Sequence, residues 1–233
     1  MALYHIISVF RNMQWTATAG RSGDPEQFMD AHRNNSETAH NPKGHTLGII
    51  GLGNIGYRIA QKAYAAFDMK IAYVDPVPKP AEREAAVGAK RCPDLEALLA
   101  VSDCVVISAP GGAEGGKALI DSERLAKMKN GSRLVNVGRG NLVDGDALAD
   151  ALESGHLVAA GLDVHENEPH VNPRLLALRD VSLTCHTAGG AVETRSGFEE
   201  LAIRNCIHAI LGKEPLTPVN KHLLEQEGQH SCK

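Results

Sequence analysis

Residues 46–56, TLGIIGLGNIG, constrain the fold more than any other stretch of the chain. The apolar run at 47–52 is typical of a strand buried on both faces. It ends in a G-x-G-x-x-G turn made by Gly51, Gly53 and Gly56. Apolar residues then recur at helical spacing, at Ile55, Ile59, Ala63 and Phe67. A strand, a glycine turn and a helix in this order predict a turn that holds a dinucleotide pyrophosphate, with Asn54 and Ile55 beside the glycines.

A second strand is expected at residues 70–75, and it ends on a carboxylate, Asp75. An acidic residue at this place accepts the hydroxyls of the adenosine ribose and repels a 2′-phosphate. The pattern therefore predicts NAD as the cofactor, bound in preference to NADP.

Composition and charge exclude several classes of protein. The net charge of −4 and the lack of a dense Lys/Arg cluster argue against a nucleic-acid partner. No apolar run approaches the roughly 18 residues of a membrane span, and residues 1–13 lack the basic start of a secretory signal. The five cysteines are an odd number without a C-x-x-C pair, which favours reduced thiols, a cytoplasmic location and no metal site. We expect Cys104 and Cys185 to be buried.

From residue 46 onward, strand and helix patterns alternate. Strands are expected at 46–51, 70–75, 104–109, 132–137, 158–163 and 181–185, with a weak one near 89–92. Helices are expected at 54–67, 80–87, 94–101, 121–129, 144–154, 172–178 and 191–211. Such alternation predicts an α/β fold, a doubly wound parallel sheet of the Rossmann type. We divide the chain into a short N-terminal helical segment (1–45), the NAD-binding domain (46–190) and a C-terminal helix with a polar tail (191–233).

The N-terminal segment predicts one amphipathic helix over residues 2–18. Its apolar stripe comprises Leu3, Ile6, Ile7, Phe10 and Met13. A second helix is expected from Pro25, capped by Asp24, to about Arg33. The stripe has no strand of its own to cover it, so it packs either on the nucleotide domain or on a second subunit.

Three chemically suggestive residues follow the ends of predicted strands. Arg139 follows 132–137, Glu168 follows 158–163, and His186 follows 181–185. Alone, each residue has a plainer reading as a surface charge or a structural histidine. Together they suit hydride transfer to a ketone beside a carboxylate, because Arg holds the carboxylate and His donates a proton to the developing alkoxide. A carboxylate behind the histidine keeps it oriented and favours its protonated form.

The motifs GIIGLGNIG, SAP, NVGRG, GLDVHENEP and HTAGG together resemble the D-isomer-specific 2-hydroxyacid dehydrogenase family, most closely its fungal D-mandelate dehydrogenase-like branch. The resemblance covers residues 1–220. It implies that Arg139 and His186 are the catalytic arginine and histidine, and that Glu168 is the catalytic carboxylate. It implies that Asp163 holds the nicotinamide carboxamide. The remaining cofactor positions that it implies are Ala109, Pro110, Val137, Gly138 and Gly189.

The chain also departs from the family pattern. The family has two lobes, and the substrate lobe is built mainly from about a hundred residues that precede the position of Met1. We therefore expect a cleft with one wall, in which water is less well excluded. The loop 111–116 is glycine-rich where the family has a polar loop, Gly138 replaces a usual Ala, and Cys185 replaces a usual Pro.

The first hypothesis is an NAD-dependent oxidoreductase that interconverts a 2-keto acid and a D-2-hydroxy acid. Two alternatives stay open: a descendant that uses the pocket for a non-redox reaction, and an NAD-sensing interaction protein. We also expect a homodimer, because the N-terminal stripe would be exposed on a nucleotide domain that lacks its partner lobe.

Overall fold

The computed structural model describes residues 1–111 and 116–218. Residues 112–115 of the glycine-rich loop expected at 111–116, and the part of the polar tail from residue 219 onward, lie outside the described residues. The chain divides into two compact units, residues 1–188 and the segment that begins at Gly189. Each unit is described by itself.

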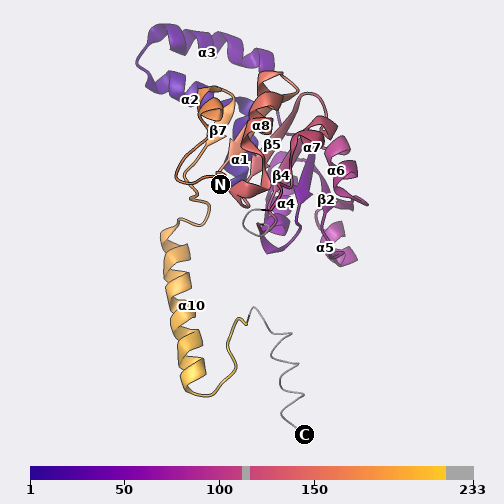
Figure 1. Ribbon diagram of the computed structural model, residues 1–233, viewed down its shortest axis with the longest axis vertical. Helices are drawn as coiled ribbons and strands as arrows, with labels where there is room; N and C mark the ends of the chain where they lie inside the picture. The colour runs from indigo at the N-terminus through magenta and orange to yellow at the C-terminus, as the bar shows by residue number, and fades with distance from the viewer. Residues whose placement is uncertain (112–115, 219–233) are drawn as a thin grey trace. The chain divides into compact units, whose positions relative to one another are not determined.

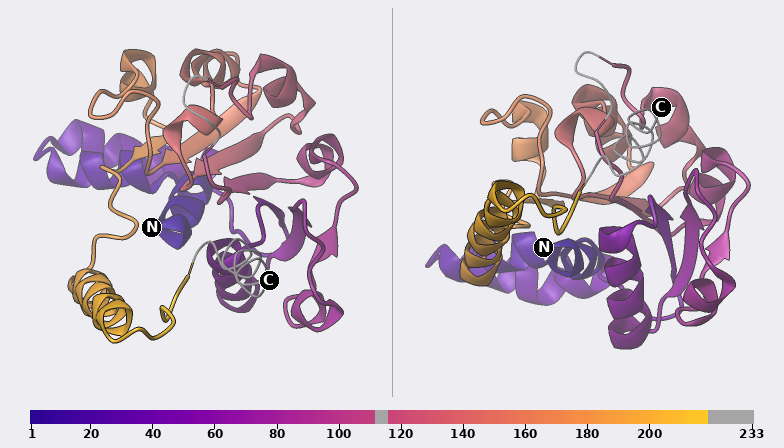
Figure 2. Two further views of the ribbon diagram at one scale, coloured as in Figure 1. Left: turned by 60° about the horizontal axis from the view of Figure 1, so that its bottom comes forward. Right: turned by 90° about the horizontal axis from the view of Figure 1, so that it is seen from below.

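The first unit is built on one seven-stranded sheet (Figures 1 and 2). Its strands are β1 (Thr46–Ile50), β2 (Lys70–Val74), β3 (Lys90–Arg91), β4 (Cys104–Ile107), β5 (Ser132–Asn136), β6 (Leu157–Leu162) and β7 (Val181–Leu183). All neighbouring strands are parallel, in the order β3-β2-β1-β4-β5-β6-β7. The predicted doubly wound parallel sheet is confirmed.

Helices cover both faces of this sheet, and a separate apolar core lies under each face. Side chains alternate along a strand, so Leu47 and Ile49 of β1 enter one core while Ile50 enters the other. Helices α1 (Ala2–Arg11) and α4 (Asn54–Phe67) cover the first core. The second core is covered by α6 (Leu95–Val101), α7 (Ser122–Lys127), α8 (Gly145–Glu153) and α9 (Pro173–Ala177). A short helix, α5 (Ala81–Ala85), follows β2, and a 3₁₀ turn, η1 (Gly140–Leu142), follows β5.

Aspartate side chains fix where several of these helices begin. The Asp94 carboxylate accepts from the Ala97 amide at 2.7 Å at the start of α6, and Asp121 accepts from the Arg124 amide at 3.1 Å in α7. Such a cap contributes about 1 kcal/mol to helix stability. The predicted helix starts in the sheet region are therefore met within two residues.

The single N-terminal helix expected over residues 2–18 is wrong. Asn12 adopts a left-handed conformation with φ 52°, so α1 ends at Arg11 and α2 (Met13–Arg21) starts afresh. The side-chain Nδ2 of Asn12 donates to Asn35 Oδ1 at 3.2 Å and to Thr38 Oγ1 at 2.8 Å. These bonds tie the break to α3 (Pro25–Thr38), which is longer than expected and pairs with α2 in a hairpin that projects from the sheet (Figure 1).

The apolar stripe of α1 packs on the chain's own sheet. Ile6 and Phe10 are fully buried, and Leu3 and Ile7 are half-buried. Of the stripe, only Met13 is exposed, because it lies beyond the break at Asn12. The packing on the nucleotide domain is therefore confirmed, and the expectation that an exposed stripe would drive association is wrong.

The second unit is a single helix, α10 (Val192–Ile210), with the short segment that follows it. None of its residues is buried. In the part of the chain that the structure describes, no helix is both long and apolar enough to cross a membrane.

Candidate active site

The strand order reverses between β1 and β4, and ligands of such sheets bind beyond the carboxyl ends of the strands at this point. The glycine turn follows β1 there, and Ser108 and Ala109 follow β4. The Ser108 hydroxyl donates to the Gly51 carbonyl at 2.7 Å. Gly51 has φ 88°, and a Cβ on it would lie 3.1 Å from Ala109 Cα. Only glycine lets the two connections approach this closely.

The start of α4 fits a pyrophosphate. Gly53 precedes the helix, no side chain caps it, and a Cβ on Gly53 would meet nothing within 4 Å. A Cβ on Gly56 would lie 2.1 Å from the Gly51 carbonyl oxygen, so the third glycine allows close packing of helix and turn. Asn54 and Ile55 are exposed, and Ile55 keeps 66% of its surface open. The free N–H groups of the first helical turn are thus available to an anion.

Asp75 lies at the end of β2, where the ribose of a bound dinucleotide is expected. Its Oδ2 accepts from the Leu52 amide at 2.8 Å, which ties it to the glycine turn. Its Oδ1 lies 3.0 Å from Lys79 Nζ, and both side chains are nearly buried. Desolvation acts to raise the pKa of Asp75, but the bonds from Lys79, Val77 and Leu52 outweigh it and hold that pKa below its ordinary value. The carboxylate is therefore charged and already paired with a cation.

The connection after β5 carries Val137, Gly138 and Arg139, and Asn136 holds it in place. The Asn136 side chain accepts from the Gly138 amide at 3.0 Å and donates to the Arg139 carbonyl at 2.8 Å. A Cβ on Gly138 would lie 2.8 Å from the Ala109 carbonyl oxygen, so the backbone is too close here for a larger residue. Arg139 is exposed, and its guanidinium donates only to the Gly138 carbonyl, at 2.7 Å, among the described residues. Asn136 is the first residue of the NVGRG motif, but the sequence did not predict that its side chain would hold this connection in place.

Glu168 and His186, from the connections after β6 and β7, meet directly. Glu168 Oε2 lies 2.8 Å from His186 Nδ1, and both side chains are partly exposed. Glu168 Oε1 accepts from the His165 amide at 2.9 Å. Desolvation acts to raise the pKa of Glu168, but the bonds from His186 and His165 are stronger and keep it below its ordinary value. The carboxylate stays ionised and holds the ring so that Nε2 is left for a substrate.

The remaining predicted residues are placed as follows. Pro110 is exposed, and a Cβ on the next residue, Gly111, would lie 2.9 Å from Arg139 Cγ, so this segment flanks the arginine. Asp163 is fully buried. Gly189 begins the second unit, and its position relative to the first is not described. The expectation of a buried Cys185 is wrong, because β7 ends at Leu183 and Cys185 is exposed on the turn that carries His186.

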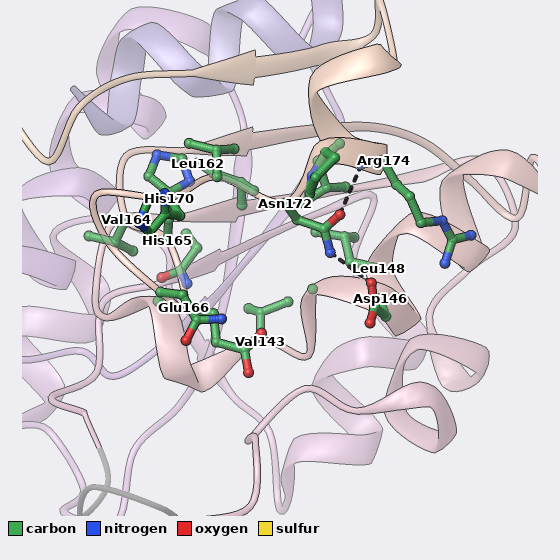
Figure 3. Close-up of a pocket in the computed structure, with 17 residues that line it drawn as sticks. Val143, Asp146, Leu148, Leu162, Val164, His165, Glu166, His170, Asn172 and Arg174 are labelled. Carbon is green, nitrogen blue, oxygen red and sulfur yellow. Dashed lines mark hydrogen bonds between the residues drawn. The ribbon is translucent and has the colours of Figure 1, made fainter.

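A pocket of about 510 Å³ is lined in part by His165, Glu166 and His170, which belong to the loop that carries Glu168 (Figure 3). Its polar rim includes Asn172, whose amide donates to Asp146 Oδ1 at 2.8 Å and whose Oδ1 accepts from the Arg174 amide at 2.9 Å. None of the glycine turn, Arg139, Glu168 and His186 lines it. The predicted catalytic residues therefore do not form the wall of this pocket.

Known proteins resemble this chain in sequence and fold. The domain described as "D-isomer specific 2-hydroxyacid dehydrogenase, NAD binding domain" matches residues 3–188. The crystal structure of holo D-mandelate dehydrogenase from Rhodotorula graminis superposes with a TM-score of 0.91 at 46% identity, covering 94% of this chain and 64% of that one. The chain belongs to the D-isomer specific 2-hydroxyacid dehydrogenase family.

Family members with other names are also similar. The glyoxylate reductase of Thermococcus kodakarensis is 41% identical over 182 residues, 78% of this chain and 54% of that protein. The NADPH-dependent glyoxylate/hydroxypyruvate reductase of Sinorhizobium meliloti, solved with NADP and malonate, has a TM-score of 0.78 at 32% identity, covering 94% of this chain and 65% of that one. The chain thus spans about half the length of the curated relatives it matches, and the half it spans is the family's NAD-binding domain.

The ribose end of the site leads to a first prediction. We expect NAD to bind more tightly than NADP, because Asp75 would face the 2′-phosphate. Asp75→Asn is expected to reduce the difference in binding free energy between NAD and NADP by about 1.5–3 kcal/mol, the size of a hydrogen bond to a charged group. Lys79→Met is expected to increase the difference in affinity between NAD and NADP, since Lys79 offsets the negative charge of Asp75. Calorimetric titration with both cofactors measures each difference.

Asp68→Asn is the matched control, because Asp68 is an exposed carboxylate at the far end of α4, paired with Lys43 at 3.2 Å. It is expected to leave both affinities unchanged. Equal affinities of the native chain for NAD and NADP would remove the argument from Asp75.

Proposed function

We propose that the chain performs NAD-dependent interconversion of a 2-keto acid and a D-2-hydroxy acid. The observation that carries this proposal is the 2.8 Å bond between Glu168 and His186, at the same edge of the sheet as the glycine turn and Arg139. The dinucleotide, when bound, supplies or accepts the hydride. The exposed Ile55 and the uncapped start of α4 support a cofactor at this edge.

The chain's own residues then have separable tasks in the direction of reduction. Arg139 binds the substrate carboxylate through its paired N–H groups. His186, protonated, gives the proton on its Nε2 to the carbonyl oxygen as the carbonyl carbon receives the hydride. Glu168 stays ionised and stabilises the imidazolium. The product is the hydroxy acid, and His186 regains its proton from solvent before the next turnover.

Consumption of NADH by the purified chain across a panel of 2-keto acids tests the proposal. The panel includes phenylglyoxylate and glyoxylate, since the relatives are named for mandelate and glyoxylate. We expect a rate that saturates with at least one keto acid. Binding of NADH without conversion of any keto acid of the panel would favour the NAD-sensing alternative. Conversion of a keto acid without consumption of NADH would favour the non-redox alternative.

The carboxylate-binding role gives a second prediction. Arg139→Ala is expected to raise the KM for the keto acid by about 10–100-fold, because hydrogen bonds from a charged donor contribute about 1.5–3 kcal/mol. Affinity for NADH should be unchanged. Steady-state kinetics with the keto acid varied at saturating NADH measure the effect. Arg179→Ala, which removes another exposed arginine, is the control, and an equal rise in KM there would contradict a specific role for Arg139.

The third prediction concerns assembly. We propose a two-fold homodimer of the nucleotide-binding unit in the cytoplasm, with the interface away from the α1 stripe that the chain itself buries. The exposed aromatic ring of Phe28 on the projecting α2–α3 hairpin supports an interface there, since it keeps 54% of its surface open. Light scattering at micromolar concentration is expected to give twice the chain mass, and a monomer of 24.8 kDa would contradict the proposal.

A further inference from the structure

The turn that carries His186 has an unusual backbone. His186 has φ 55°, one of three non-glycine residues with positive φ in the described chain. A positive φ is uncommon in residues other than glycine, although histidine adopts it more readily than most, so the contacts around the turn decide how firmly it is held. Its amide donates to the Asp163 carbonyl at 2.7 Å, so the turn is anchored to the end of β6.

The Asp163 side chain anchors the residues on both sides of His186. Its Oδ1 accepts from the Thr184 hydroxyl at 2.6 Å and from the Thr187 amide at 3.0 Å. Its Oδ2 accepts from the Ala188 amide at 2.8 Å. The carboxylate is fully buried, and three of its roughly four acceptor positions are used within this one turn.

A buried histidine from the other end of the chain completes the arrangement. His5 of α1 is fully buried, with Nε2 2.9 Å from Thr184 Oγ1 and Nδ1 3.2 Å from Ser182 Oγ. The Thr184 hydroxyl has one proton, and it gives that proton to Asp163. It can therefore only accept from His5, which requires the proton on Nε2 and leaves Nδ1 to accept from Ser182.

The fold makes room for this contact at Gly161 of β6. A Cβ on Gly161 would lie 2.8 Å from His5 Cβ and 3.0 Å from Nδ1. No larger residue leaves space for the ring between α1 and the end of the sheet. The sequence pattern of β6 did not reveal this, because the residue that needs the space lies far away along the chain.

We propose that His5, Thr184 and Asp163 form a positioning chain that holds the His186 turn in the conformation from which His186 meets Glu168. His5 and Thr184 are positioning residues that act through Asp163, and neither touches the expected substrate. The catalytic consequence rests on the proposed function, whereas the arrangement itself does not. It gives α1 a direct part in the geometry of the site.

The test compares two isosteric substitutions three residues apart. Thr184→Val removes the hydroxyl that bridges His5 and Asp163. Thr187→Val removes the hydroxyl of a residue in the same turn that bonds Asp163 only through its backbone amide. Two NMR measurements report on the turn: amide hydrogen exchange at His186, Thr187 and Ala188, and the imidazole nitrogen shifts of His186, which respond to its bond with Glu168. In Thr184→Val we expect exchange at least about tenfold faster and shifts nearer those of a free imidazole. Thr187→Val is expected to match the native protein.

Two conservative variants separate positioning from general damage. Thr184→Ser keeps the hydroxyl and is expected to restore native exchange and shifts. At His5, Leu removes the donor and Gln keeps an N–H at the corresponding reach, so His5→Leu should loosen the turn and His5→Gln should largely preserve it. This pair decides the matter if Thr184→Val does not fold.

Kinetics add a second readout. If the chain reduces a keto acid, Thr184→Val should lower kcat about tenfold with the KM for the keto acid unchanged, because Arg139 lies on another connection. Loosened NMR signals in a chain without turnover would support the positioning chain and contradict the proposed function. Native exchange and native His186 shifts in both Thr184→Val and His5→Leu would overturn the inference, whatever the rate of turnover.

Discussion

Replacing His186 by alanine is expected to lower kcat for keto-acid reduction by about 10²–10⁴-fold, the usual contribution of a positioned general acid. Glu168 cannot give the proton in its place, because it bonds Nδ1, is ionised and can only accept. The affinity for NADH should stay within about twofold, because the glycine turn and Asp75 lie on other connections. Stopped-flow measurement of NADH oxidation at saturating keto acid gives the rate.

His170→Ala is the matched control for this prediction. His170 is an exposed histidine in the loop that carries Glu168, and it lines the neighbouring pocket in Figure 3. Its loss should leave kcat unchanged. Equal losses in the two variants, or a His186→Ala enzyme that retains more than a tenth of the native rate, would show that His186 is not the acid.

The second large effect is expected in the pH dependence of stability. Burial lowers the pKa of His5 from 6.5 to about 4, against a smaller raising effect of Asp163, with the amino terminus and His165 also acting to lower it. Between pH 6.5 and 4 the unfolded chain therefore binds a proton that the folded chain does not. The free energy of unfolding should fall as the pH falls through this window, by about 3 kcal/mol in all, since one pKa unit corresponds to about 1.4 kcal/mol. Above pH 6.5 and below pH 4 this contribution should not change.

Urea denaturation at pH 7.5, 5.5 and 4.5 measures this dependence. His5→Gln keeps an N–H donor but does not titrate, so its free energy of unfolding should fall less than that of the native chain by about the same 3 kcal/mol. His32→Gln, which removes an exposed histidine of α3, should behave as the native chain. If the free energy of unfolding fell with pH by the same amount in the native chain and in His5→Gln, His5 would not be neutral in the folded protein.

Much of the fold could be predicted because its determinants are local. The apolar run at 47–52, the glycines that follow it and the Asp caps of α6 and α7 each act within a few residues, so their strands, turns and helix starts follow from short stretches of sequence. The same holds for the three connections that carry Arg139, Glu168 and His186. Residue types at strand ends gather at one edge once the sheet is parallel.

What could not be predicted depends on contacts between distant residues. Asn12 breaks the N-terminal helix because its amide bonds Asn35 and Thr38 of another helix. His5 reads as one polar residue within an amphipathic helix, and its partners Ser182 and Thr184 lie 177 and 179 residues further along the chain. The pairing of Asp75 with Lys79 depends on a turn that β2 alone does not specify.

The central claim is hydride transfer at the edge where Arg139, Glu168 and His186 gather, and isotope transfer tests it most directly. The purified chain is incubated with a 2-keto acid that it consumes, or with phenylglyoxylate if none is consumed measurably. Two parallel reactions use NADH deuterated on one C4 face or on the other. The product is analysed by mass spectrometry and chiral chromatography. The account predicts, in one of the two reactions, a D-2-hydroxy acid one mass unit heavier with the deuterium on C2, formed about 10²–10⁴-fold more slowly by His186→Ala. A hydroxy acid that lacks deuterium in both reactions, or no hydroxy acid in either, would contradict it.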